Sequence, residues 1–126
     1  MHILHVISSL RVGGAEKIVK DLTMELNNSG HVVDVAVFDG TESMFKRELL
    51  FNGCRVYVLS RRGIVYSPYN IIGLLKLMGS YDIVHAHNTA PQFFVAICSI
   101  FVKTLLVTTE HSTSNRRRNN PICFFF

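Results

Sequence analysis

The sequence has few cysteines, and their spacing excludes two common roles. Three occur, at Cys54, Cys98 and Cys123, and no two of them form a CxxC pair. An odd number without that spacing is typical neither of a disulfide framework nor of a cysteine zinc site. A reducing cytoplasm is therefore the expected location.

Long apolar runs are also missing. The longest extends from Phe93 to Val102, is interrupted by Ser99 and ends at Lys103. A membrane-spanning helix needs about 20 apolar residues, so this run has the length of a buried helix. Met1 leads directly into a predicted strand, and no secretory leader is expected. The 126 residues, 48% of them hydrophobic, instead predict one globular domain with a sizeable core.

Two familiar phosphate-binding signatures are absent. The pair Gly13-Gly14 lies in VGGAEK, which is not G-x-G-x-x-G and is not followed by G-K-[ST]. This disfavours a dinucleotide cofactor and a P-loop nucleotide, so no cofactor is expected. A fragment of a dinucleotide-dependent oxidoreductase is the weaker alternative, and tight binding of NAD would support it.

The sequence does contain a regular alternation of apolar strands and amphipathic helices. The first two predicted strands are apolar on both faces apart from His5 and Asp34 in their interiors, which is typical of a parallel sheet covered by helices. His5 is expected to be a hydrogen-bonded core histidine. The predicted strands are residues 3–7, 31–38, 54–59, 81–86 and 105–109. This order predicts an α/β fold with a doubly wound, Rossmann-like parallel sheet.

Short sequence patterns indicate where two helices begin and where an ion pair along a helix is favoured. Thr41 is predicted to cap a short helix. Ser67-Pro68 is predicted to start another, because proline in the first helical position loses no hydrogen bond. Glu16 and Lys20 stand four positions apart, in the order that favours an ion pair along a helix.

Polar residues gather where the predicted strands end. The exits carry hydroxyl, imidazole, amide or charged side chains, although the strand interiors are almost free of them. Because the carboxyl ends of parallel strands meet at one edge of a sheet, that edge is the predicted ligand site. Its candidate residues are Ser9, Gly13, Gly14, His85, His87, Asn88, Glu110 and His111. For the glycine pair, a tight turn and close helix packing are equally good explanations.

His85 and His87 are alternate residues, so both side chains are expected on the same side of the fourth strand. A His-x-His pair can bind metal, but no third histidine, cysteine or carboxylate is spaced to complete the shell. No metal site is therefore expected. A hydrogen bond to a substrate hydroxyl, or core packing of His85, is the favoured interpretation.

The positive charge is modest and clustered. The net charge is +4, and much of it comes from Arg61-Arg62 and from residues 116–118. Such clusters suit phosphate-bearing ligands or peripheral contact with an anionic membrane, and exposed solvated loops explain them equally well. No nucleic-acid partner is expected.

The chain ends on a basic stretch followed by apolar residues. Residues 115–120 (NRRRNN) are predicted to form an exposed loop, and PICFFF follows. Three terminal phenylalanines without polar neighbours indicate a chain interrupted within an element, or alternatively a tail that packs on its own domain. Residues 1–112 are therefore expected to form the domain, and 113–126 the basic loop and the truncated start of the next segment.

Four blocks in order resemble the N-terminal domain of family 4 glycosyltransferases. They are HILHVISSLRVGGAEKIVKDL, GHVVDVAVF, YDIVHAHN and TTEHSTSNRRR, and the resemblance extends to about Arg118. It implies the N-terminal, acceptor-side lobe of a retaining GT-B enzyme. Such enzymes move a sugar from a nucleotide-sugar donor to a glycan or lipid-linked acceptor in surface polysaccharide synthesis, usually without metal, often at the cytoplasmic face of the membrane.

The resemblance also implies roles for single residues. By position, Gly13 and Gly14 face the donor diphosphate, and His111 contacts the transferred sugar, which makes it the catalytic candidate. The block from His85 to His87 lines the acceptor side. The family's donor-binding lobe carries an E-x7-E pair, which these 126 residues lack. The chain alone is thus expected to transfer no sugar. The alternative is a non-catalytic remnant, or a split-enzyme subunit that needs a donor-binding partner.

Overall fold

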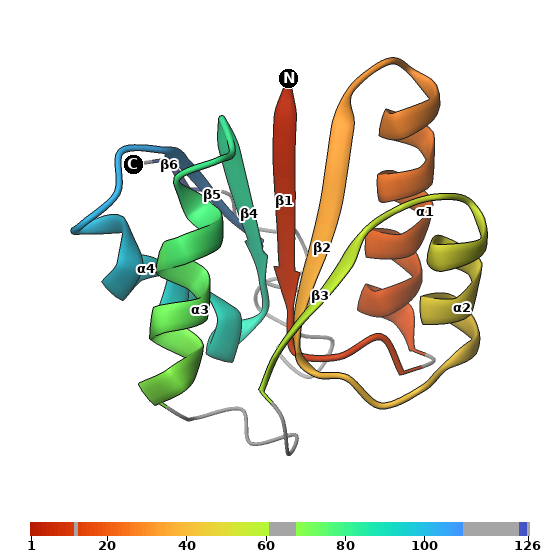
Figure 1. Ribbon diagram of the computed structural model, residues 1–126, viewed down its shortest axis with the longest axis horizontal. Helices are drawn as coiled ribbons and strands as arrows, with labels where there is room; N and C mark the ends of the chain where they lie inside the picture. Colours follow the sequence, from red (N-terminus) through yellow and green to blue (C-terminus); the bar gives the residue numbers. More distant parts are fainter. Residues whose placement is uncertain (12, 61–67, 110–123, 126) are drawn as a thin grey trace, which may run out of the picture.

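A six-stranded sheet forms the centre of the computed structural model, which describes residues 1–11, 13–60, 68–109 and 124–125 (Figure 1). The strand order is β3-β2-β1-β4-β5-β6. The first five pair in parallel, whereas β6 pairs antiparallel with β5. The elements are β1 (His2–Ile7), α1 (Gly14–Asn28), β2 (Val32–Asp39), α2 (Met44–Phe51), β3 (Val56–Ser60), α3 (Pro68–Met78), β4 (Ile83–His87), α4 (Thr89–Ser99), β5 (Leu105–Thr109) and β6 (Phe124–Phe125). The predicted α/β fold with a parallel, Rossmann-like sheet is confirmed.

Helices cover both faces of the sheet and bury a separate core on each. Helices α3 and α4 pack on one face against the even-numbered positions of β1, and α1 and α2 pack on the other (Figure 1). The first core includes Leu4, Val6, Phe38, Leu74, Met78, Val84, Ala86, Phe94 and Leu106. The second includes Ile7, Val19, Val35, Val37, Phe45 and Leu49. Because side chains alternate along each strand, two apolar faces require the near-continuous apolar strands seen in the sequence.

The ends of the helices follow ordinary capping chemistry. Gly30 and Gly53 adopt positive φ angles of 97° and 80° just beyond α1 and α2, where a side chain would be strained. Helix α2 is capped by Ser43, whose Oγ accepts a hydrogen bond from the Lys46 N–H at 3.1 Å. The prediction of Thr41 as this cap is wrong, because Thr41 instead donates to Asp39 in the turn after β2.

The topology reverses between β1 and β4. From β1 the chain proceeds through β2 to β3, and it then crosses back to place β4 on the other side of β1. In open α/β sheets, ligands bind at the carboxyl ends of the strands beside such a reversal. The first turns of α1 and α4 both begin at this edge, at the lower end of the sheet in Figure 1.

None of the helices within the described residues has the length and apolar character that crossing a bilayer demands.

Candidate functional site

The exit of β1 is tied to the exit of β2. The Ser8 carbonyl accepts hydrogen bonds from the backbone N–H groups of Phe38, at 3.1 Å, and Asp39, at 2.8 Å. Leu10 is fully buried behind this turn, while Ser9 is half-buried. The loop that leads to the glycine pair is therefore anchored on both sides, and Ser9 is held at the carboxyl edge.

Neither glycine of the pair is required by its own backbone conformation. Gly13 precedes α1 in an extended conformation, with φ −174° and ψ 176°, and Gly14 is the first helical residue. A Cβ on Gly13 would meet only the flexible end of Glu16, at 2.6 Å, and a Cβ on Gly14 would meet nothing within 4 Å. A tight turn or close helix packing therefore does not explain the pair. Gly14 leaves open space at the first turn of α1, a turn that the N-cap residue does not cap with a side chain.

An arginine that the sequence did not indicate lies at the same edge. Arg11 donates to the Asp39 carboxylate at 2.9 Å and to the Thr41 hydroxyl at 3.3 Å, and its side chain remains 65% exposed. The Thr41 hydroxyl, its backbone N–H and the Arg11 guanidinium hold the pKa of Asp39 below its usual value. The pair thus keeps a cation fixed between the exits of β1 and β2.

Three histidines meet across β1 and β4. His5 lies opposite His85 in the register of the two strands, and His87 follows two residues later on the same side. The rings of His85 and His87 stack with centroids 4.0 Å apart, and His5 lies 5.2 Å from the first and 5.1 Å from the second. The His5 Nδ1 and His87 Nε2 atoms share a hydrogen bond of 2.9 Å. The predicted hydrogen-bonded core position of His5 is confirmed.

The cluster corrects the expectation that the His85–His87 pair has no third partner. One ring nitrogen from each of His5, His85 and His87 lies within 4.8 Å of the other two. His5 and His87 are each 1% exposed, and His85 is half-buried. Burial, reinforced by the neighbouring His85, lowers the pKa of His5 to about 3. A neutral imidazole is thus held inside the sheet, directly behind the carboxyl edge.

Asn88 follows the histidines in a conformation that residues with side chains rarely adopt. Its φ is 70° and its ψ is 178°, and no other non-glycine residue in the described ranges has a positive φ. Its backbone N–H donates to the Thr109 carbonyl at 2.9 Å, and the same carbonyl accepts from the Gln92 side chain at 3.0 Å. This region of φ and ψ belongs almost only to glycine, and such strain collects at functional sites.

We expect glycine at position 88 to give a more stable protein than alanine. Asn88→Gly and Asn88→Ala both remove the amide, but only alanine keeps the Cβ that strains this backbone. The glycine variant should be more stable by about 1 kcal/mol in urea unfolding, the reverse of the usual order. Ala96→Gly, on the exposed side of α4, is the control and should lose about 1 kcal/mol. Equal or higher stability of Asn88→Ala would contradict the strain.

Several predicted residues lie outside the described ranges. They are Glu110 and His111, the clusters Arg61-Arg62 and 116–118, and the segment 113–126 apart from the short strand β6. The proposed roles of these residues stay predictions.

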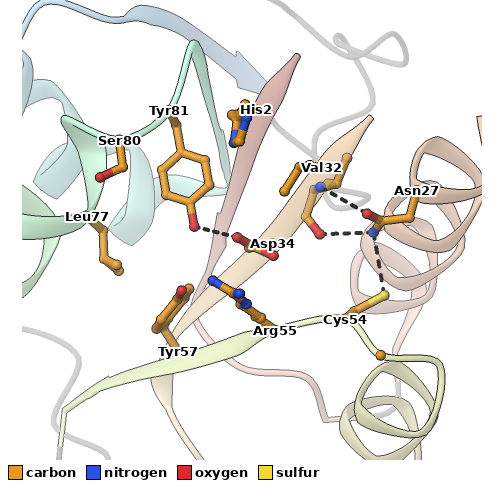
Figure 2. A pocket seen from close by; sticks show the side chains of 12 residues that line it. His2, Asn27, Val32, Asp34, Cys54, Arg55, Tyr57, Leu77, Ser80 and Tyr81 are labelled. Carbon is orange, nitrogen blue, oxygen red and sulfur yellow. Dashed lines mark hydrogen bonds between the residues drawn. The ribbon is translucent and has the colours of Figure 1, made fainter. Parts of the chain in front are cut away.

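A pocket of about 480 Å³ lies at the opposite, amino-terminal edge of the sheet (Figure 2). His2, Cys54, Arg55 and Tyr57 line it, together with a buried pair in which the Tyr81 hydroxyl donates to Asp34 at 2.6 Å. The amide of Asn27 closes its other side through hydrogen bonds to the backbone of Val33. The pocket is therefore separated from the carboxyl edge by the length of the strands.

Residues 12–124 match the sequence profile of Glycosyltransferase Family 4. The chain belongs to this family. The match includes the glycine pair, the block from His85 to Asn88 and the basic stretch near Arg118.

A family 4 assignment agrees with a curated relative. The chain is 26% identical over 117 residues to EpsF of Bacillus subtilis (strain 168), a protein assigned as a glycosyltransferase. The match covers 89% of this chain and 30% of EpsF. The chain therefore spans less than a third of the length of that relative.

Solved structures of glycosyltransferases share the fold. HepE of Anabaena, crystallised with UDP-glucose, matches with a TM-score of 0.70 and 22% identity, over 86% of this chain and 28% of HepE. A glycosyltransferase from Rickettsia africae ESF-5 matches with a TM-score of 0.62 and 18% identity, over 85% of this chain and 28% of that protein. The sheet described above thus corresponds to the N-terminal part of GT-B glycosyltransferases.

Proposed function

We propose that this chain is the acceptor-side lobe of a retaining glycosyltransferase. The enzyme moves a sugar from a nucleotide-sugar donor to a glycan or lipid-linked acceptor in surface polysaccharide synthesis. The observation that carries the proposal is the open space at Gly14 at the start of α1, beside the reversal between β1 and β4, in a family 4 chain. Binding of UDP-glucose by HepE, which shares this fold, supports a nucleotide sugar as the donor.

The proposed donor contact follows from elementary electrostatics. The first N–H groups of a helix lack intrahelical partners, and the helix dipole adds partial positive charge there. A diphosphate satisfies both, provided that no side chain keeps it away. Gly14 provides that space, whereas the Glu16 carboxylate reaches back over Gly13 and must move aside for an anion.

The proposed acceptor side lies around the exit of β4. Ser9 and Asn88 are at the carboxyl edge, and the half-buried His85 has Nε2 2.6 Å from the Thr109 hydroxyl. His87 is 1% exposed and immediately precedes Asn88 in the chain. His111 is the proposed catalytic contact to the transferred sugar, with Glu110 beside it.

Transfer requires a second lobe, and this requirement is the central test. The 126 residues contain no E-x7-E pair to hold the donor. The purified chain should release no UDP from UDP-glucose, and addition of the donor-binding lobe of a family 4 enzyme should restore release. Turnover by the chain alone would contradict the proposal. A well-formed two-lobe complex without turnover across several nucleotide sugars would favour the non-catalytic remnant.

The glycine pair offers a sharper test within such a complex. Gly14→Ala adds one methyl group to open space, so stability should stay equal or rise by about 0.5 kcal/mol. Donor affinity should nevertheless fall about tenfold or more, equal to about 1.4 kcal/mol. The control is Gly79→Ala, which also meets nothing within 4 Å but follows α3 at the far edge of the sheet. An unchanged donor Kd in Gly14→Ala would remove the diphosphate from this turn.

A location at the cytoplasmic face of the membrane is proposed as well, because the basic clusters suit an anionic surface. The chain should pellet with vesicles that contain phosphatidylserine in low salt, and pelleting should weaken as salt is raised. Absence of binding to anionic vesicles at low salt would contradict this part of the proposal.

A further inference from the structure

One buried ring nitrogen in the cluster of His5, His85 and His87 has no hydrogen-bond partner. His5 uses Nδ1 toward His87, while its Nε2 is buried without a hydrogen-bond partner. Buried polar atoms are almost always paired, and an exception in a well-packed interior calls for a ligand, an ion or a chemical role. The unpaired nitrogen belongs to His5, the residue that β1 contributes to the cluster.

The chemistry of the cluster narrows the kind of ligand. All three residues offer an imidazole nitrogen, and the group that comes within 4.8 Å contains neither a cysteine nor a carboxylate. Neutral imidazole suits zinc, copper and nickel, whereas magnesium and calcium require oxygen ligands.

The distances also suit one ion. Zinc–nitrogen bonds of about 2.0–2.1 Å in a tetrahedral shell place two ligand nitrogens about 3.4 Å apart. The His5 Nδ1 and His87 Nε2 atoms are 2.9 Å apart, and the widest pair in the set lies within 4.8 Å. These separations are therefore close to the spacing that a tetrahedral zinc shell requires.

We propose that His5, His85 and His87 form a binding site for one zinc ion between β1 and β4. Three protein nitrogens leave a fourth position for water. The ion would bind one ring nitrogen of each histidine, and it would join the two strands on either side of the topological reversal. The site lies behind the carboxyl edge and shares His85 and His87 with the proposed acceptor side, but zinc binding is measured without sugar transfer and goes beyond that proposed function.

The direct test is metal binding by the full chain after treatment with EDTA. Titration with Zn²⁺, followed by calorimetry and by metal analysis after dialysis, should show one ion per chain and a raised Tm, because zinc binds only the folded site. His85→Gln should weaken binding at least tenfold. The matched control is His2→Gln, which removes the exposed histidine at the start of β1 and should leave zinc affinity unchanged.

A second measurement covers the case in which His85→Gln does not fold. The unmodified chain loaded with Co²⁺ should show strongly shifted, exchangeable ring N–H proton resonances from three imidazoles. Retention of less than one zinc per chain after dialysis would overturn the proposal. Loss of binding in His2→Gln, unchanged binding in a folded His85→Gln variant, or shifted resonances from fewer than three rings would overturn it as well.

Discussion

Acidification below pH 6.5 should destabilise the metal-free chain by up to about 1.4 kcal/mol per pH unit, because His5 cannot accept a proton while it is buried. Its pKa is lowered from 6.5 to about 3, first by burial and then by the charge of the neighbouring His85. Between these two pH values, His5 binds a proton in the unfolded chain but not in the folded chain. The contribution of His5 to the free energy of unfolding is therefore fully present above pH 6.5, and it is lost as the pH falls toward 3.

The change in the free energy of unfolding per pH unit is measured by urea unfolding at several pH values. EDTA is present, since bound zinc would hold the same histidine deprotonated. His5→Gln has no titrating ring at this position, so its stability should depend less on pH over the same range. His2→Gln is the control for the loss of an exposed histidine and should keep the slope of the unmodified chain. Equal slopes in His5→Gln and the unmodified chain would show that His5 does not carry the effect.

The fold could be predicted because its signal is local and repeated. Each buried strand needs apolar residues on both faces, and each helix needs an apolar stripe, so both patterns are visible along the chain. The observed starts of β3 and β4 differ from the predicted ones, because apolar residues also lie shortly before them. Cys54 and Tyr81 lie before β3 and β4 rather than in them, because they line the amino-terminal edge of the sheet.

The third histidine could not be predicted, because register is a tertiary property. His5 and His87 are 82 positions apart, and only the pairing of β1 with β4 brings them together. The alternation rule placed His85 and His87 on one side of their strand but could not say which side of β1 they would face. His5, a lone polar residue in an otherwise apolar central strand, was the available signal; it predicted a hydrogen-bonded core histidine but not which residues it would meet.

Local spacing also failed where a tertiary partner was stronger. Glu16 and Lys20 have favourable helical spacing, yet Lys20 bonds Glu48 of α2 at 2.9 Å and Asp21 at 3.1 Å. Its ammonium also lies 5.0 Å from the centre of the Phe45 ring, where the cation is attracted by the ring face. The side chain of Glu16 instead folds back over Gly13. A helix face that packs on another helix therefore overrides the pairing that an isolated helix would show.

The buried pair in Figure 2 should make a large contribution to stability: Tyr81→Phe is expected to cost about 1.5–3 kcal/mol. Tyr81 and Asp34 are 8% and 6% exposed, and the hydroxyl donates to the carboxylate at 2.6 Å. Burial and the hydrogen bond to Asp34 raise the pKa of Tyr81, so it remains a donor at every physiological pH. Phenylalanine fills the same space but leaves a buried charge without this donor.

A double-mutant cycle separates the pair from packing. Asp34→Ala removes the carboxylate that Tyr81→Phe would leave unsatisfied, so the double variant should lose less than the sum of the single variants. A coupling of about 1 kcal/mol or more in urea unfolding would assign the effect to the hydrogen bond, and additive losses would assign it to shape alone. Because Asp34 lies in β2 and Tyr81 precedes β4, the coupling would measure how firmly the amino-terminal edge holds the strands on either side of β1. The same strand register extends to the carboxyl edge, because the pairing that places Leu4 opposite Val84 also places His5 opposite His85.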